Sequence, residues 1–256
     1  MIKIENVEVI GWEAAIRGMR NPLNSWERSD SKRCSEVNFT DCEGCPLLDD
    51  AHDGCFGIGD NPLVIGPNDY DLMMRLRNAG TDHRKFMRMI TVYADVIAPL
   101  YWWKEFDTYK VGTVANSCST MHKIHAKEFT LDDFSHEHLL EPKDVHVPDD
   151  SCCNSNWEGC GIIAPIDILE ETVNMLNKAR EMFLKTKDKR YWWQMIQLLP
   201  SSYNQKRTVM LNYEVLANIY KSRKDHKLDC WRDFCSWIET RPYSELITNE
   251  DKFDGG

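Results

Sequence analysis

Four cysteines near the start of this 256-residue chain are candidate metal ligands. Cys42 and Cys45 have the two-residue spacing of one half of a zinc or iron–sulfur site, and Cys34 and Cys55 add two thiolates from the same segment. A segment with little hydrophobic core gains stability from a metal that holds it together. A structural zinc or iron–sulfur group is therefore one interpretation, and free or disulfide-linked cysteines are the other.

A second polar set lies between residues 212 and 223. Asn212 and Asn218 are predicted to lie on one helix, and a buried asparagine needs partners for both its donor and its acceptor groups. These partners are either a cofactor ring or nearby backbone. Arg223 stands at the expected end of this helix, where the helix dipole favours a cation and where a guanidinium can also bind a ligand.

Two further residues have reactive side chains. Cys118 is a candidate nucleophile, but His122 and His125, the bases it would need, are near it in sequence only. His83 follows a glycine-containing turn. It either contacts an anionic or aromatic ligand or caps the turn.

The elements that must position these residues are several helices around a few strands, which is an α+β arrangement. Alternating and β-branched residues predict strands over 1–10 and 87–96. Helices are predicted over 12–19, from Asn68 or Asp69 to Gly80, from Ala98-Pro99 through Trp103, and over 165–185, 191–199, 208–223 and 230–240. The apolar face of helix 165–185 includes Ile168, Leu169, Val173, Leu176, Ala179 and Phe183.

Composition limits the class of protein. The net charge of −10 disfavours binding to a nucleic-acid polymer, although a local basic site can still bind a small anion. No segment approaches the roughly 20 apolar residues of a membrane helix, and the first residues lack a secretory signal, so a cytoplasmic protein without membrane contact is expected. We expect one domain over 1–256, with irregular, cysteine-rich inserts at about 28–62 and 141–162.

The order of these motifs resembles the flavin-dependent thymidylate synthase (ThyX-like) family. One matching segment runs from Asp71 through Gly80-Thr81-Asp82-His83 to Ala98-Pro99 and the aromatic run at 100–106. The other is Leu199-Pro200 followed by Asn212, Leu216, Asn218 and Arg223. Together with Ala15-Ile16-Arg17 after the first strand, these segments cover about half of the chain.

This resemblance implies an antiparallel sheet with packed helices, bound FAD, methylenetetrahydrofolate and NADPH as cosubstrates, and a homotetramer. It places near the flavin the residues His83, Lys85, Arg88, Asn212, Glu214 and Asn218. Tyr109 and Lys110 are expected to contact the flavin or a substrate anion. Arg223 would touch the pyrimidine and polarise its carbonyl group, and Glu105, where the family has glutamine, would contact the base.

The nucleotide-binding signature of the family is altered here. It falls on Thr108-Tyr109-Lys110, Thr113, Ala115-Asn116, Cys118 and Thr120-Met121. Threonines replace the two arginines that hold the substrate phosphate in the family, and each such contact is worth about 1.5–3 kcal/mol. We expect Asn116 and Cys118 to contact the substrate. We also expect one or more of the basic residues Lys110, Lys123, Lys206 and Arg207 to bind its anion, unless Lys206 and Arg207 are a solvated basic pair.

The leading hypothesis is flavin- and folate-dependent methylation of a deoxyuridine nucleotide such as dUMP. The altered signature leaves two alternatives. One is a related flavin enzyme with a different pyrimidine substrate or product, such as a hydroxymethylase. The other is a catalytically inactive binding or assembly protein on the same fold.

Overall fold

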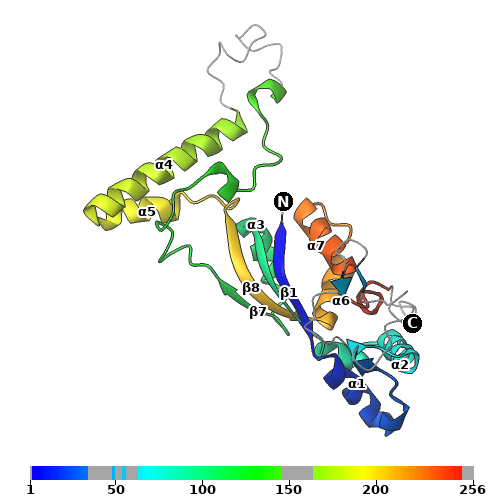
Figure 1. Cartoon of the computed structure of the whole chain (residues 1–256). Helices are drawn as coiled ribbons and strands as arrows, with labels where there is room; N and C mark the ends of the chain where they lie inside the picture. Colours follow the sequence, from blue (N-terminus) through cyan, green and yellow to red (C-terminus); the bar gives the residue numbers. More distant parts are fainter. Residues whose placement is uncertain (1, 34–47, 50–53, 56–62, 146–163, 250–256) are drawn as a thin grey trace. The chain divides into compact units, whose positions relative to one another are not determined.

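The computed structural model describes residues 2–33, 48–49, 54–55, 63–145 and 164–249 (Figure 1). The chain divides into two compact units. The larger unit comprises Ile2–Val96, Glu105–Asn116 and Arg207–Gly256, and the smaller unit comprises Ile97–Lys104 and Ser117–Lys206. The fold is α+β, an antiparallel sheet with packed helices, as predicted.

The main sheet has four strands in the order β1-β6-β8-β7. Their bounds are Lys3–Ile10 for β1, Thr91–Pro99 for β6, Asn204–Asn212 for β8 and Val114–Ser117 for β7. Alternate residues of β6 are buried, beginning at Val92, because successive side chains of a strand point to opposite faces. Strand β7 is an edge strand, and all four of its residues are exposed.

The larger unit also contains most of the helices near the candidate site. These are α1 (Trp12–Arg20), α2 (Pro67–Asn78), η5 (Arg84–Arg88), α6 (Tyr213–Arg223), α7 (Asp229–Glu239) and α8 (Glu245–Thr248). Helix α6 contacts α7, α8 and η5. Short pieces complete the unit: η1 (Asn21–Leu23), η2 (Trp26–Arg28), β2 (Lys32–Arg33) paired with β5 (Leu63–Val64), and β3 (Leu48–Asp49) paired with β4 (Gly54–Cys55).

Asp69 anchors the start of α2 to the rest of the larger unit. Its carboxylate is fully buried, and it accepts hydrogen bonds from Arg20 Nε at 2.6 Å, Ser29 Oγ at 2.7 Å and Ser31 Oγ at 2.6 Å. Burial raises the pKa of Asp69, but these hydrogen bonds outweigh it, and the pKa lies below its ordinary value. Asp69 is thus not the N-cap that the sequence suggested; Gly66 holds that position and Pro67 is the first helical residue.

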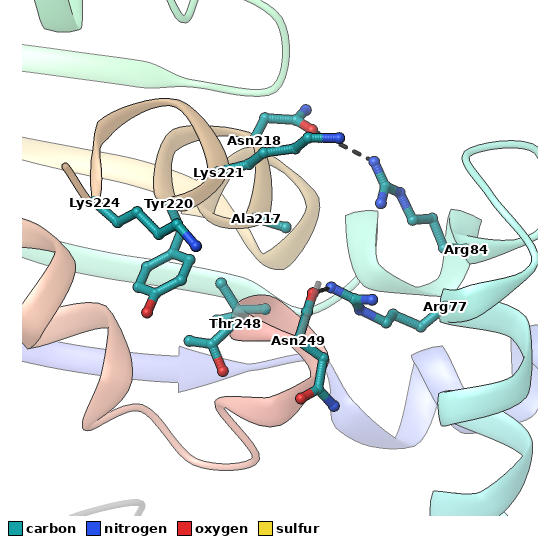
Figure 2. Close-up of a pocket in the computed structure, with 10 residues that line it drawn as sticks. Arg77, Arg84, Ala217, Asn218, Tyr220, Lys221, Lys224, Thr248 and Asn249 are labelled. Carbon is teal, nitrogen blue, oxygen red and sulfur yellow. Dashed lines mark hydrogen bonds between the residues drawn. The ribbon is translucent and has the colours of Figure 1, made fainter. Parts of the chain in front are cut away.

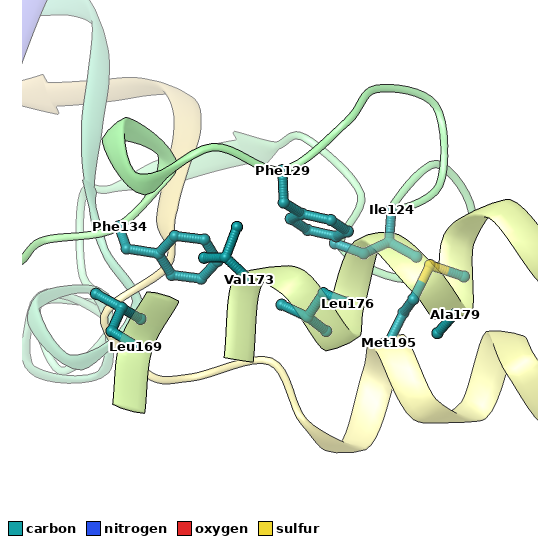
Figure 3. Close-up of a cluster of buried hydrophobic side chains, with 8 residues drawn as sticks. All are labelled: Ile124, Phe129, Phe134, Leu169, Val173, Leu176, Ala179 and Met195. Atoms are coloured by element: carbon teal, nitrogen blue, oxygen red, sulfur yellow. The ribbon is translucent and has the colours of Figure 1, made fainter. Parts of the chain in front are cut away.

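The smaller unit is built on two helices, α4 (Pro165–Thr186) and α5 (Lys189–Gln197). The apolar face of α4 contributes Leu169, Val173, Leu176 and Ala179 to a buried cluster with Ile124, Phe129, Phe134 and Met195 (Figure 3). The 3-10 helices η6 (Leu131–Asp133) and η7 (Pro142–Asp144) also belong to this unit. The predicted face is correct at these four positions of α4, and Phe183 packs against the cluster, but Ile168 is exposed.

Helix α3 (Leu100–Phe106) begins in the smaller unit and ends in the larger one. The sequence analysis places its opening at Ala98-Pro99, but Pro99 is the last residue of β6. The strand expected over 87–96 likewise starts later, at Thr91, because Arg84–Arg88 form η5. None of the helices in the described ranges is long and apolar enough to cross a membrane.

The prediction of one helix over 208–223 is wrong. Residues up to Asn212 form β8, with Gln205, Val209 and Leu211 buried, and α6 begins only at Tyr213. Asn212 is the N-cap of α6: its side-chain Oδ1 accepts a hydrogen bond from the backbone N–H of Val215 at 3.0 Å. Asn212 and Asn218 therefore do not share a helix face; one ends a strand and the other lies within the helix.

Candidate active site

Glu105 and Arg223 lie 118 residues apart in sequence and are in contact in the larger unit. Glu105 is near the end of α3, and Arg223 is the last residue of α6. Arg223 Nη1 donates to Glu105 Oε2 at 2.7 Å. The Arg223 side chain is 19% exposed and that of Glu105 is 35% exposed, so the ion pair is shielded yet reachable from solvent.

Aromatic side chains fix the orientation of this pair. The indole N–H of Trp231, from α7, donates to Glu105 Oε2 at 2.9 Å, and the Arg223 guanidinium lies 4.7 Å from the centre of the Trp231 ring. Arg223 Nε donates to the Tyr109 hydroxyl at 3.0 Å. His226 Nε2 lies 3.6 Å from Glu105 Oε2. We call Glu105, Tyr109, Arg223, His226 and Trp231 the Glu105–Arg223 cluster.

The Glu105–Arg223 cluster has a defined chemical capacity. A carboxylate only accepts hydrogen bonds and a guanidinium only donates them, so the two side by side present an acceptor next to donors. A planar group with an adjacent N–H and C=O matches this pattern. The guanidinium can also stabilise negative charge that develops on a bound oxygen.

The turn before β7 packs directly on the start of α6. Gly112 has φ +78°, and a Cβ atom added there would meet Asn212 Nδ2 at 2.7 Å. Only glycine combines this backbone conformation with such a close approach. The segment with the altered signature, which includes Tyr109 and Lys110, therefore runs past Asn212, the N-cap of α6.

The predicted substrate-binding residues occupy exposed or paired positions. Asn116 is exposed on the edge strand β7. Cys118 follows the end of this strand and has an exposed free thiol, and its backbone N–H donates to Lys206 O at 2.9 Å. Arg207 Nη1 donates to Asp107 at 2.7 Å. Lys206 and Arg207 are neighbours in β8, where successive side chains point to opposite faces, so they do not converge on one anion.

A second polar cluster in the larger unit brings together three residues expected near the flavin. Glu214 pairs with Arg88 of η5 and with Arg84 Nε, the latter at 3.4 Å. Arg84 Nη2 also donates to Asn218 Oδ1 at 3.4 Å. In the Arg88 guanidinium, the hydrogen bond to Glu214 raises the pKa.

Asn218 lines a cavity of about 370 Å³ between α2, η5, α6 and the α8 segment (Figure 2). Figure 2 shows Arg77 and Arg84 reaching toward it from one side and the side chains of α6 from another. The full lining is Arg77, Arg84, Ala217, Asn218, Tyr220, Lys221, Lys224, Ile247, Thr248 and Asn249.

His83 and Lys85 stand apart from these contacts. Both are exposed, and the backbone N–H of His83 donates to Gly80 O at 3.0 Å, in the turn that precedes η5. Arg84, which lies between them and makes the contacts with Glu214 and Asn218, was not predicted from the sequence. Trp231 and His226 were not predicted either. The one sign of this role in the sequence is that Arg84 is a cation directly after His83.

The proposed metal ligands are largely outside the described residues. Cys34, Cys42 and Cys45 lie there, and of Cys55 only the backbone in β4 is described. Within residues 2–33, 63–145 and 164–249, His, Cys, Asp and Glu side chains form no group of three or more that could hold a metal ion. The cysteine site stays a prediction.

No protein-family model matches this sequence, and no curated protein matches it. Solved structures do. Thymidylate Synthase X (ThyX) from Helicobacter pylori with FAD and dUMP is similar at 14% identity and a TM-score of 0.56, over 98% of this chain and 97% of that chain. The chain has a ThyX-like fold.

Two further solved structures are similar to this chain. The Helicobacter pylori flavin-dependent thymidylate synthase ThyX complexed with FAD and dUMP is similar at 15% identity and a TM-score of 0.57, over 96% of this chain and 99% of that one. The UMP/dUMP methylase PolB from Streptomyces cacaoi bound with 5-Br dUMP gives 13% identity and a TM-score of 0.51, over 97% and 93%. Identities this low establish the fold, and the chemistry has to be argued from the residues.

Proposed function

We propose that this protein is a flavin- and folate-dependent enzyme that methylates a pyrimidine nucleotide, with a deoxyuridine nucleotide such as dUMP as the leading substrate. The observation that supports it most is the contact of Glu105 with Arg223. These are the two residues expected to contact the pyrimidine, and they form an accessible ion pair on a fold whose similar structures contain FAD and dUMP.

The Glu105–Arg223 cluster would act on the edge of the base. A uracil ring presents a carbonyl oxygen beside its N3–H, so Arg223 can donate to the oxygen while Glu105 accepts from the N–H. As carbon 5 of the ring becomes nucleophilic, negative charge grows on that oxygen, and the Arg223 guanidinium stabilises it. Tyr109 and Trp231 act as positioning residues, because they hold the guanidinium in place.

The residues around Asn218 fit FAD. The Asn218 amide can hydrogen-bond a flavin ring edge, and the Arg84 and Arg88 guanidinium groups can face phosphate oxygens. Bound reduced flavin would supply the reducing equivalents for forming the methyl group. We propose as further contacts His83, Lys85, Tyr109, Lys110, Asn212 and Glu214. Because Asn212 Oδ1 caps α6, only its amide nitrogen would serve the cofactor.

The remaining parts of the proposal follow from the same family resemblance. Methylenetetrahydrofolate would donate the carbon, NADPH would reduce the flavin, and the enzyme would be a homotetramer. On the substrate side, Asn116, Cys118 and one of the two neighbouring cations, Lys206 or Arg207, would contact the nucleotide. Unchanged nucleotide affinity after Lys206→Gln and Arg207→Gln would remove these two cations from the proposal.

The test is the release of tritium from carbon 5 of labelled dUMP. The protein, loaded with FAD, is incubated with methylenetetrahydrofolate and NADPH, and both tritium and dTMP are measured. Equal amounts of the two products support methylation. The absence of tritium release from a flavin-loaded protein, with dUMP, UMP and dCMP each tried, contradicts the proposal.

A second candidate is a flavin enzyme with another pyrimidine product, such as a hydroxymethylated nucleotide. The positions where the family holds the substrate phosphate with arginine carry Thr108 and Thr120 instead. Thr108 is exposed and its hydroxyl donates to Glu105 O at 2.7 Å. Tritium release without dTMP, with a hydroxymethyl nucleotide detected by mass spectrometry, would favour this candidate.

A further inference from the structure

The carboxylate of Glu105 has one oxygen that is hydrogen-bonded within the chain and one that is available. Oε2 accepts from Arg223 Nη1 at 2.7 Å and from the indole N–H of Trp231 at 2.9 Å, which occupies the acceptor positions of that oxygen. Among the described residues, no donor is hydrogen-bonded to Oε1. Because the Glu105 side chain is 35% exposed, a ligand beside Arg223 can reach this second oxygen.

The described side chains that pair with the Glu105 carboxylate all present donors to it. Arg223 and Trp231 have only N–H groups to offer. His226 Nδ1 accepts a hydrogen bond from the backbone N–H of Leu228 at 3.2 Å, so a neutral His226 ring carries its proton on Nε2. That nitrogen lies 3.6 Å from Glu105 Oε2. Surrounded in this way, Glu105 acts as an acceptor, and a ligand has to bring a donor to it.

An acceptor beside a donor distinguishes between pyrimidine rings. In cytosine the 4-amino group is a donor directly beside N3, which is an acceptor, so Glu105 can accept from the amino group while Arg223 donates to N3. In uracil the only donor on this edge is N3–H, and it lies between two carbonyl oxygens. Arg223 can pair with one of these oxygens, and the other is left facing the Glu105 carboxylate, acceptor against acceptor.

We propose that the Glu105–Arg223 cluster binds cytosine nucleotides such as dCMP at least as tightly as uracil nucleotides, and that the Glu105 carboxylate recognises the 4-amino group. The inference rests on the proposed function, because it assigns the same cluster to the pyrimidine ring, and it extends the ligand class from uracil to cytosine. Carboxylates accept from this amino group in protein–DNA complexes as well. Arg223 supplies the neighbouring donor, and its guanidinium is held 4.7 Å from the centre of the Trp231 ring.

The experiment measures the binding of dCMP and dUMP by isothermal titration calorimetry, to the protein as purified and after incubation with FAD. The test variant is Glu105→Gln, which keeps the shape of the side chain. The matched control is Glu181→Gln, which removes the same charge at an exposed position of α4. Circular dichroism verifies that each variant is folded. A third ligand, the dCMP analogue with hydrogen in place of the 4-amino group, tests the same contact on the wild-type protein alone.

We expect dCMP to compete with dUMP and to bind the wild-type protein and the Glu181→Gln control equally. In Glu105→Gln, Arg223 and Trp231 hold the amide oxygen, so the amide N–H groups face the ligand. They oppose the amino group of cytosine and match a carbonyl oxygen of uracil. The variant should therefore bind dCMP about tenfold or more weakly, and dUMP no more weakly, than the wild type does. The analogue should bind the wild type about tenfold or more weakly than dCMP.

Three results overturn the proposal. One is weaker binding of dCMP than of dUMP by the wild-type protein, and another is dCMP binding that does not compete with dUMP. The third is an equal loss of affinity for both nucleotides in a folded Glu105→Gln variant. If that variant does not fold, the analogue decides, because equal affinity of the wild type for dCMP and for the analogue excludes recognition of the amino group.

A failure of the proposed function looks different. Binding of dCMP that depends on Glu105, in a protein that retains no FAD and releases no tritium from labelled dUMP or dCMP, keeps the cytosine site and removes the methylation. Tritium release from dUMP by a protein that binds dCMP more weakly than dUMP does the reverse.

Discussion

Replacing Arg223 with lysine tests the chemistry of the Glu105–Arg223 cluster with the positive charge retained. Arg223 donates to Glu105 at 2.7 Å and to Tyr109 at 3.0 Å, and its guanidinium lies over the Trp231 ring. A lysine ammonium is a point charge that cannot keep both planar hydrogen bonds and the ring contact. The variant therefore keeps the ion pair at best, and loses the directed N–H groups that the proposal assigns to the pyrimidine carbonyl.

The expected loss can be estimated from these contacts. Removing one donor to a developing oxyanion costs about 2.7–4 kcal/mol, so kcat/KM for tritium release from labelled dUMP should fall about 100-fold or more. The folded state also loses a hydrogen bond and a cation–π contact, and because the Arg223 side chain is only 19% exposed, a stability loss of about 1 kcal/mol is expected.

The control is Arg190→Lys, because Arg190 is exposed and pairs with Asp188 at the start of α5, outside the Glu105–Arg223 cluster. This change should leave both kcat/KM and stability close to wild type. A flavin-loaded Arg223→Lys variant with kcat/KM within twofold of the Arg190→Lys control would refute the role given to Arg223.

Three further predictions concern stability, each measured by urea unfolding. Asp69→Asn should lower the free energy of unfolding by about 3–5 kcal/mol, because it leaves the buried Arg20 guanidinium without its carboxylate. Since folding lowers the pKa of Asp69, the stabilisation from its carboxylate is present above the unfolded pKa and is lost as the pH falls through the folded pKa. A variant whose stability depends on acid pH in the same way as the wild type would contradict this. Hydrogen bonding to Glu239 raises the pKa of Tyr220 to about 12, so the stabilisation from this hydroxyl is complete below pH 10.0 and is lost between pH 10.0 and about 12. Tyr220→Phe should remove this fall in the free energy of unfolding with pH. Leu176→Ala, at a fully buried position of the α4 cluster, should cost about 2–5 kcal/mol, whereas a loss below about 1 kcal/mol would mean that the cluster is loosely packed.

The spacing of apolar residues predicted which residues of a helix are buried, but it did not predict where strand β8 ends and helix α6 begins. The apolar spacing of α4 identified Leu169, Val173, Leu176 and Ala179 correctly. It also assigned Ile168 to the core, although Ile168 is 57% exposed, because an apolar residue beside a helical stripe carries no signal of its orientation.

The interpretation of 208–223 as one helix failed for a similar reason. The strong helical signal of α6 was extended backward into β8, whose alternation is visible only when Val209 and Leu211 are considered with Gln205. Asn212 can stand in a helix or cap one, and its hydrogen bond to Val215 decides for the cap.

No pattern of neighbouring residues in the sequence predicted that Glu105 and Arg223 form a pair. Glu105 and Arg223 meet through contacts between residues far apart in sequence, which include the hydrogen bond from Trp231 of α7 to Glu105. Only the family resemblance suggested that both would lie near one ligand. The role of Arg84 was missed because no resemblance singled it out, although it connects Glu214 and Asn218.

The proposed function requires this protein to bind FAD that can be reduced and reoxidised. The most direct measurement is the absorption spectrum of the purified protein after incubation with FAD and removal of unbound flavin by gel filtration. We predict a retained oxidised-flavin band that is bleached on reduction and restored by air, and that is weakened when Arg84 and Asn218 are both replaced with alanine. A protein that stays colourless at FAD concentrations well above its own would contradict the account and favour a binding or assembly protein on the same fold.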